Sequence, residues 1–390
     1  MSYKFPLATA TWDQDELNAM QRVIASGMFT MGKEVKVFEE SFAKYVGSKY
    51  AVMVNSGSSA NLLMVATLFY TKNPRINLKR GDEVIVPAVS WSTTYYPLYQ
   101  YGLKIKFVDI DLATLNYDLD QLRQAVTDRT RAIMVVNLLG NPNDFSVIQN
   151  IIGNKDIVLI EDNCESLGAE FKDKKTGTFG VMGTFSTFFS HHISTMEGGL
   201  VVTDDQELYQ ILLSLRAHGW TRNLPKENLV CGTKSDDSFK ESFRFVLPGY
   251  NLRPLEISGA IGVEQVKKLP NLILERRRNG VLLQNALANH SELLIQSEIG
   301  KSSWFGFSLV IKRSSAWTRK DLLKKLTDLG FECRPIVAGN FAKNEVVKYF
   351  DSEVHGNLEN AEHVDENGLF IGNHHYPISE AISKLKNLKL

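Results

Sequence analysis

Short apolar segments rich in β-branched residues alternate along the chain with longer segments in which apolar residues recur at helical spacing. Continuous apolar strands separated by helices are typical of a mostly parallel sheet that is covered on both faces. The expected strands are 51–54, 83–86, 105–108, 132–136, 157–160 and 200–203. The expected helices between them include 59–70, 119–126 and 206–216. The pattern therefore predicts an α/β fold.

The two ends of the chain differ from this central pattern. Thr11-Trp12-Asp13-Gln14 has the form of a capping box, and the helix that continues through 19–26 can end at Gly27. Beyond Val263 the pattern predicts a long helix, a strand, a second helix and a strand start, at 267–288, 302–311, 319–329 and 331–335. We therefore expect a large domain over residues 1–263 and a smaller α+β domain over 264–390.

Composition excludes several classes of protein. The 390 residues carry 44 Lys and Arg against 44 Asp and Glu, so nothing indicates a broad surface for nucleic acid or membrane. The N-terminus lacks a signal-peptide layout, and no stretch is long enough to span a bilayer. Three scattered cysteines, Cys164, Cys231 and Cys333, argue against a disulfide framework and fit a reducing cytoplasm. No metal site is expected.

A candidate phosphate site follows the first strand. Asn55-Ser56-Gly57-Ser58-Ser59-Ala60 opens a helix with small residues, which let backbone N–H groups approach an anion at the positive end of the helix. Ser186 could add a hydroxyl to the same phosphate. The same six residues also fit an ordinary strand–turn–helix junction with Ser as N-cap.

Two further groups follow apolar strands. Glu161-Asp162-Asn163-Cys164-Glu165-Ser166 places carboxylates where burial is costly unless they have partners, and a pyridinium nitrogen would be such a partner for Asp162. An acidic helix start is the simpler alternative. In Pro87-Ala88-Val89-Ser90-Trp91, the indole can stack on a flat heterocycle or pack in the core. Because ligands bind at the carboxyl ends of parallel strands, we expect these groups to meet.

The segment from Phe185 to Gly199 carries His191 six residues before the Glu of Glu197-Gly198-Gly199. It resembles the cofactor loop of the sugar aminotransferases that use pyridoxal phosphate (PLP), which have a lysine at this position. Ser190-His191-His192, the 216–222 segment and the 248–254 segment match the same family. No lysine occurs from Thr176 to Pro225, so a shifted alignment cannot restore one. An imidazole moves protons but cannot hold the cofactor as a Schiff base.

The resemblance covers nearly the whole chain and implies the fold of aspartate aminotransferase (fold type I), with a mostly parallel sheet of seven strands. It also implies a homodimer with shared active sites. By resemblance, Gly57, Ser58 and Ser186 bind the cofactor phosphate, and Asn251 reaches it from the neighbouring subunit. Trp91 stacks on the ring, Asp162 pairs with the pyridine nitrogen, and Glu165 lies near the ring hydroxyl. His218 and Arg222 line the substrate side.

Within the family, the chain is most similar to members that serve the biosynthesis of colitose, a deoxysugar of lipopolysaccharide O-antigens. The resemblance implies that L-glutamate converts PLP to pyridoxamine phosphate (PMP) and leaves as 2-oxoglutarate. A GDP-linked 4-keto-6-deoxy-mannose then loses its C3 hydroxyl, with ammonia released. His191 is the expected proton carrier, whereas His192 fits either a structural or a supporting role.

Three alternatives remain open at this point. A sugar 4-aminotransferase that tolerates histidine would leave a stable amino sugar and keep the C3 hydroxyl. A CDP-linked dehydratase also has histidine here, but its iron–sulfur cluster would generally require four cysteines. A non-enzymatic PLP-binding regulator would carry an additional DNA-binding module, for which the pattern shows no segment.

Overall fold

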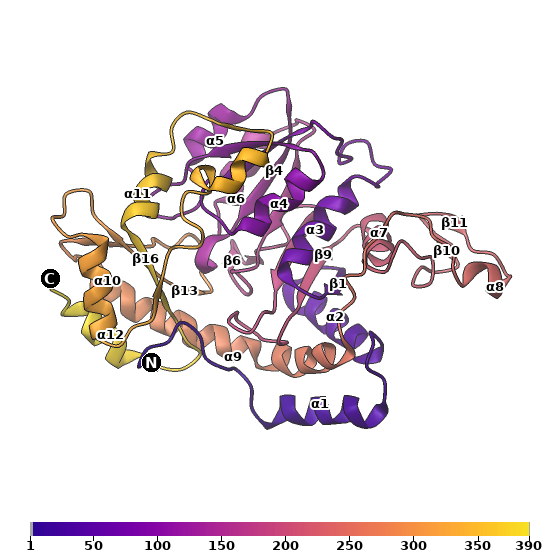
Figure 1. The fold of residues 1–390 in the computed structure, drawn as a ribbon, viewed down its shortest axis with the longest axis horizontal. Coiled ribbons are helices and arrows are strands. Elements are labelled where there is room, and N and C mark those ends of the chain that lie inside the picture. Colours follow the sequence, from indigo (N-terminus) through magenta and orange to yellow (C-terminus); the bar gives the residue numbers. More distant parts are fainter. Residues whose placement is uncertain (1–2, 390) are drawn as a thin grey trace.

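A large, mostly parallel sheet lies at the centre of the computed structural model, which describes residues 3–389 (Figure 1). In this part of the chain the sheet has eight strands, in the order β1-β9-β8-β5-β4-β2-β3-β15. β9 runs against both of its neighbours, and the other strands share one direction. The strands are β1 (Tyr50–Val54), β9 (Gly199–Thr203), β8 (Met182–Ser186), β5 (Val158–Asp162), β4 (Thr130–Val136), β2 (Glu83–Pro87), β3 (Lys104–Val108) and β15 (Ser352–Val354).

The predicted α/β fold is confirmed, but the expected number of seven strands was one too low. The additional strand is β15, which comes from the C-terminal part of the chain and pairs in parallel with β3 at the sheet edge. Glu353 on β15 lies opposite Lys106 on β3, and their charged groups are 3.1 Å apart. Lys106 is buried and also pairs with Glu83 at 2.8 Å. Ion pairs, rather than a run of apolar residues, therefore help to hold β15 against β3.

Alternate residues of the strands are buried on opposite faces of the sheet. Val52 and Val54 of β1 pack into the core with α3, α4 and α7, whereas Ala51 and Met53 pack into the core with α2 and α9. This burial on both faces explains the continuous apolar strands. The helices that cover the sheet are α2 (Lys33–Val46), α3 (Gly57–Leu68), α4 (Ser92–Gln100), α5 (Leu119–Ala125), α6 (Phe145–Ile152), α7 (Gln206–Arg216) and α9 (Glu256–Leu287). Over residues 3–389, no helix combines the length and the apolar character that crossing a bilayer would require.

A smaller unit lies at the end of the molecule that holds both chain termini (Figure 1). Its four-stranded sheet has the order β12-β13-β16-β14 and shares a core with the second half of α9, α10 and α12. α9 runs without a break through the boundary predicted after Val263, so the division into two domains stays a prediction. The elements of this part are β12 (Leu293–Ile295), β13 (Gly306–Ile311), α10 (Arg319–Asp328), β14 (Cys333–Arg334), α11 (Glu359–Asn367), β16 (Gly368–Gly372) and α12 (Ser379–Lys386), with the 3-10 helices η2 (Phe341–Lys343) and η3 (Glu345–Tyr349).

The first helix, α1 (Gln14–Ser26), begins differently from the prediction. Its N-cap is Asp13, whose side chain accepts from Asp15 N–H, and the Glu16 side chain accepts from Asp13 N–H. The capping box is therefore formed by Asp13 and Glu16, and the expectation that it begins at Thr11 was wrong. Thr11 instead donates its hydroxyl to Gln265 of α9. Gly27 ends the helix as predicted, in the left-handed conformation.

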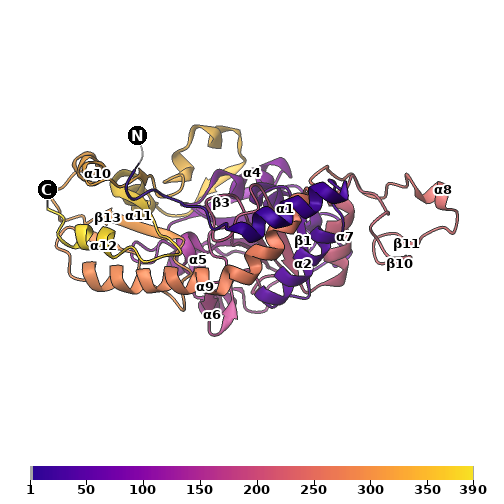
Figure 2. The ribbon, with the colours of Figure 1, turned by 90° about the horizontal axis from the view of Figure 1, so that it is seen from below.

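An arm formed by residues 222–248 projects away from the rest of the chain in both views (Figure 1, Figure 2). It contains a short ribbon of β10 (Glu227–Asn228) and β11 (Gly232–Thr233) and ends in α8 (Ser238–Glu241). Phe239 is 88% exposed, and Phe243 and Phe245 are also exposed. The remaining short elements are η1 (Leu138–Gly140), β6 (Glu170–Phe171) and β7 (Lys174–Lys175).

Candidate active site

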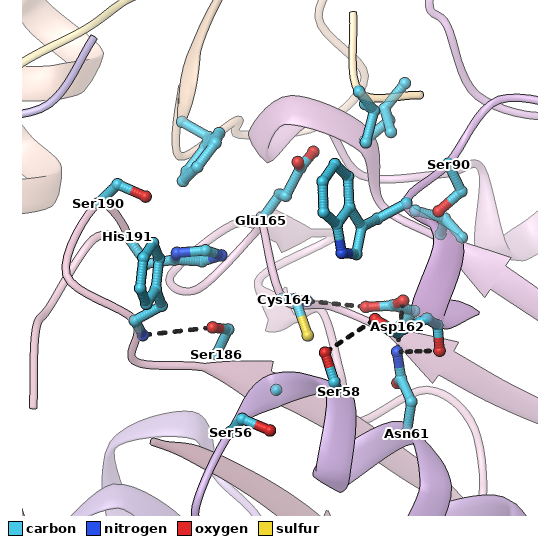
Figure 3. A pocket seen from close by; sticks show the side chains of 18 of the residues that line it. Ser56, Ser58, Asn61, Ser90, Asp162, Cys164, Glu165, Ser186, Ser190 and His191 are labelled. Atoms are coloured by element: carbon cyan, nitrogen blue, oxygen red, sulfur yellow. Dashed lines mark hydrogen bonds between the residues drawn. The ribbon is translucent and has the colours of Figure 1, made fainter. Parts of the chain in front are cut away.

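A cavity of about 420 Å³ opens at the carboxyl ends of β1, β2, β5 and β8 (Figure 3). These are the ends at which parallel sheets bind ligands. Seven residues that the sequence placed in the site line this cavity. They are Gly57, Ser58, Trp91, Asp162, Glu165, Ser186 and His191. Trp91 comes directly before α4 and is 56% exposed, so one face of its indole is free to stack on a flat ligand.

The first turn of α3 forms an anion cradle on one side of the cavity. Ser56 is the N-cap, and its hydroxyl accepts from Ser59 N–H at 3.0 Å. A Cβ atom on Gly57 would lie 2.7 Å from Ser186 Cβ and 3.1 Å from Cys164 Sγ, so a side chain here would fill the space beside Ser186. A helix N-terminus with small residues and a nearby hydroxyl fits a phosphate.

Asp162 presents a carboxylate with no cationic partner in the described residues. Its Oδ2 accepts from Asn61 Nδ2 and from the Thr94 hydroxyl, each at 2.8 Å, and its Oδ1 accepts from Cys164 N–H at 3.2 Å. These three donors are neutral and hold the carboxylate in place at the cavity wall. It is therefore free to pair with a protonated ring nitrogen, as the bound cofactor would supply.

The neighbouring carboxylate, Glu161, faces the other side of the sheet. β5 continues through Asp162, two residues beyond the predicted strand, and its alternation sends the two side chains apart. Glu161 accepts from the N–H groups of Gly177, Phe179 and Gly180 at 2.6 to 2.8 Å. Burial raises the pKa of Glu161, and these donors oppose that rise. Glu161 therefore has a structural position.

Glu165 lies between His191 and Asp162 in Figure 3. It accepts from Leu139 N–H at 3.0 Å. Burial raises the pKa of Glu165 to about 7, and the negative charge of Asp162 adds to the rise. The carboxyl can therefore exchange a proton near neutral pH.

His191 lies in the loop between β8 and β9, on the opposite side of the cavity from Asp162 (Figure 3). Its Nδ1 is buried and has no hydrogen-bond partner in the part of the chain that the structure describes. Its ring lies 5.1 Å from that of Phe305. Burial lowers the pKa of His191 to about 4, and the positive charge of Arg276 acts in the same direction. The imidazole is therefore neutral at physiological pH and available to accept a proton.

His192 does not line the cavity. It is fully buried, and its Nε2 lies 3.2 Å from the carbonyl oxygen of Ser303. A carbonyl oxygen only accepts, so Nε2 carries the proton and donates it. This bond fixes the loop to the smaller unit, which gives His192 a structural position.

Asn251, Arg222 and His218 lie away from the cavity of their own chain. Asn251 and Arg222 line a separate hollow of about 280 Å³, together with Trp220. The guanidinium of Arg222 lies 4.4 Å from the Trp220 ring, and the His218 ring lies 4.8 Å from it. Within one chain, the structure therefore does not bring these three residues to the other seven.

Sequence reasoning missed the residues that hold Asp162. Asn61 and Thr94 donate to it, and Ser90 lies 2.7 Å from the Thr94 hydroxyl. Asn61 follows Gly57 by four residues, which places the two on one helix face and could have indicated a shared site. Phe305 also lines the cavity, but it comes from the smaller unit and no local pattern connects it to the loop of His191.

Comparison with known proteins agrees with this geometry. Residues 10–385 match the DegT/DnrJ/EryC1/StrS aminotransferase family. GDP-4-keto-6-deoxy-D-mannose 3-dehydratase of Escherichia coli O55:H7 is 62% identical over 385 residues, which cover 98% of this chain and 99% of that protein.

Solved structures of such an enzyme are similar over nearly the whole chain. The E. coli GDP-4-keto-6-deoxy-D-mannose-3-dehydratase with bound hydrated PLP is 62% identical and has a TM-score of 0.98, with 99% of each chain covered. A GDP-4-keto-6-deoxymannose-3-dehydratase with a trapped PLP-glutamate geminal diamine is also 62% identical, with a TM-score of 0.97, and the match covers 98% of this chain and 99% of that one.

Proposed function

Because the chain belongs to the DegT/DnrJ/EryC1/StrS aminotransferase family, we propose that it is a PLP-dependent 3-dehydratase of a GDP-linked 4-keto-6-deoxy-mannose. The observation that carries the proposal is His191. It lies in the cavity, at the position where the family's aminotransferases have a lysine, with a free buried ring nitrogen. The relatives named above support GDP as the nucleotide, PLP as the cofactor and glutamate as the amino donor.

The overall reaction replaces the C3 hydroxyl of the sugar by hydrogen. L-Glutamate supplies the two electrons and becomes 2-oxoglutarate, and its nitrogen leaves as ammonia. One water is consumed in forming 2-oxoglutarate and ammonia, and one is formed from the departing hydroxyl. The product is a GDP-linked 4-keto-3,6-dideoxy-mannose.

The chain's residues hold the cofactor from three directions. Gly57, Ser58 and Ser186 would bind its phosphate, Trp91 would cover one ring face, and Asp162 would pair with the ring nitrogen. When bound, the cofactor supplies an electron sink for proton removal at the adjacent carbon. Asn61 and Thr94 hold the Asp162 carboxylate in the orientation that this pairing requires.

His191 is the proton carrier in this proposal. Its neutral imidazole takes a proton from the carbon next to the cofactor ring, and its protonated form can donate to the C3 hydroxyl as the hydroxyl leaves. General acid–base catalysis of this kind contributes about 10²- to 10⁴-fold to the rate. Glu165 would lie near the ring hydroxyl of the bound cofactor and could share a proton with it.

A second copy of the chain completes the site in this proposal. Asn251 reaches the cofactor phosphate across a homodimer interface, and His218 and Arg222 contact the substrate. Asn251 and Arg222 line a separate hollow, and the His218 ring lies beside Trp220 of that hollow. This position supports the arrangement, because within one chain the three residues do not line the cavity. The three free cysteines fit a cytoplasmic enzyme.

The competing function is nucleotide-sugar 4-amination. The two are distinguished by incubating the protein with PLP, L-glutamate and GDP-4-keto-6-deoxy-mannose, and by analysing the sugar product by mass spectrometry. We expect the C3-deoxygenated keto sugar together with 2-oxoglutarate and ammonia. A stable 4-amino sugar that retains its C3 oxygen would contradict the proposal.

Two variants of His191 sharpen this experiment. His191→Asn keeps the polarity but loses the titrating nitrogen, so both glutamate consumption and sugar dehydration should slow by at least about a hundredfold. Cofactor binding should persist, because the phosphate, ring and nitrogen contacts lie elsewhere. His191→Lys should instead bond to the cofactor covalently and disfavour dehydration. Near-parental rates in His191→Asn would show that another group carries the proton.

A further inference from the structure

Arg276 is a buried arginine without an acidic partner. It belongs to α9 and is 3% exposed. Its Nη1 donates to the carbonyl oxygens of Phe305 and Asn373, each at 2.9 Å. Its Nε is buried without a partner, and no carboxylate in residues 3–389 forms an ion pair with its guanidinium. A buried charge without a counter-ion is costly, so its presence indicates a role beyond filling space.

The next residue of the helix provides a comparison. Arg277 donates to the carbonyl oxygens of Ser302 and Gly168, each at 2.9 Å, and its charge lies 3.7 Å from the Glu170 carboxylate. Both arginines therefore connect α9 to neighbouring backbone, but only Arg277 has an acidic partner close by. Because no carboxylate pairs with it, the positive charge of Arg276 can influence the titratable groups around it.

Those neighbours include four histidines. For His191, His192, His374 and His375, burial lowers the pKa and the charge of Arg276 lowers it further. Of these four, His191 lines the active-site cavity. The carboxyl groups of Asp162, Glu165 and Glu197 line the same cavity, and a negative charge close to His191 would raise its pKa.

Arg276 also fixes the residue that packs against His191. The Phe305 ring lies 5.1 Å from the ring of His191 and 5.6 Å from that of His192. The backbone of Phe305 is held at both of its polar groups, because its N–H donates to the Leu139 carbonyl at 3.0 Å and its carbonyl accepts from Arg276. Arg276 therefore contacts His191 indirectly: it binds the Phe305 backbone, and the Phe305 ring packs against the imidazole.

We propose that Arg276 is a positioning residue for His191: through its hydrogen bond to the Phe305 carbonyl it fixes the Phe305 ring against the imidazole, and it brings a positive charge without a carboxylate partner to this contact. The inference rests on the proposed function of His191 as proton carrier. A cation near the ring also makes the protonated imidazole a stronger acid, which favours proton donation to the departing C3 hydroxyl.

NMR titration of the cofactor-free protein with isotope-labelled histidine tests this directly. The His191 signal is assigned by its loss in His191→Asn. In the parent protein we expect His191 to titrate below about pH 5.5, against an ordinary value of about 6.5. Arg276→Met should raise this pKa by at least about half a unit, and Arg276→Lys, which keeps the charge, should preserve the low value.

A titration of parental His191 near pH 6.5 would overturn the proposal, even if Arg276→Met fails to fold. An equal pKa in Arg276→Met and the parent would also overturn it and would leave Arg276 a packing role. In the holoenzyme, the acid limb of kcat/KM should move to higher pH in Arg276→Met and not in Arg276→Lys. Because the NMR readout requires neither cofactor nor sugar, it can succeed even where the product analysis contradicts the proposed function.

Discussion

Asp162→Asn would remove a negative charge from the cavity wall while preserving the size of the side chain. The carboxylate accepts from Asn61, Thr94 and Cys164 N–H. An amide has one acceptor oxygen, so when that oxygen faces Asn61 and Thr94, its NH2 group faces the N–H of Cys164. One donor then loses its partner, which costs about 1–3 kcal/mol of stability. The variant should still fold.

The effect on turnover should be larger than the effect on stability. A neutral amide cannot hold a protonated ring nitrogen as a carboxylate does. Removing one partner of a buried charge pair costs about 3–5 kcal/mol. At about 1.4 kcal/mol for each factor of ten, we expect turnover to fall by about 100-fold to about 4,000-fold.

The assay is 2-oxoglutarate release, with circular dichroism to establish folding. Glu161→Gln is the matched control, because it changes the adjacent carboxylate on the opposite face of β5. It should lower stability while leaving the activity of each folded molecule near the parental value. A folded Asp162→Asn with turnover within about threefold of the parent would refute the assignment of Asp162 to the ring nitrogen.

Three further predictions test other parts of the site. Borohydride treatment of the PLP form, followed by peptide mapping, should find no pyridoxyl-lysine between Thr176 and Pro225, and a stoichiometric adduct there would contradict the role of His191. Mixing inactive Asn251 and His191 variants should restore some activity if subunits exchange, because one hybrid site would contain both intact residues; no recovery despite proven exchange would place both in one subunit's site. The pKa of Glu165 is about 7 in the folded chain against an ordinary 4.5, so its contribution to stability is complete at low pH and is lost as the pH rises from 4.5 to 7. The difference in unfolding free energy between parent and Glu165→Gln should therefore fall by about 3 kcal/mol across this range in urea titrations, and a constant difference would contradict the raised pKa.

Within the large sheet, six of the eight strands have a strong apolar signal and could be predicted from the sequence, whereas the other two could not. β8 contains Gly183 and Thr184, which dilute its apolar character, although all five of its residues are buried. β15 has no apolar run, since its pairing depends on Glu353 meeting Lys106 from a distant segment. Local patterns therefore indicate strands with a continuous apolar run. They miss a buried strand whose run is interrupted, as in β8, and a strand whose pairing depends on a distant segment, as in β15.

The candidate site shows the same division. Gly57 and His191 follow strands, and Asp162 ends one. Local motifs and the rule that parallel strands bind ligands at their carboxyl ends were therefore enough to predict that these residues share one cavity. Phe305 and Arg276 come from parts of the chain whose position depends on how the smaller unit packs, and no spacing rule indicates that packing. The position of Asn251 in a separate hollow could likewise not be predicted from local patterns, because its relation to the cavity depends on a second chain.

The late position of β15 in the chain bears on how the protein is synthesised. β3 pairs with β2 on one side, and its other side stays open until the ribosome has delivered Ser352–Val354, more than half the chain later. A nascent chain therefore exposes an unpaired strand edge for most of its elongation, which invites association with other nascent chains. Once β15 has docked, the C-terminal part is joined to the large sheet by a second connection in addition to α9. The arrival of β15, which completes the large sheet, is thus the point at which this edge becomes protected.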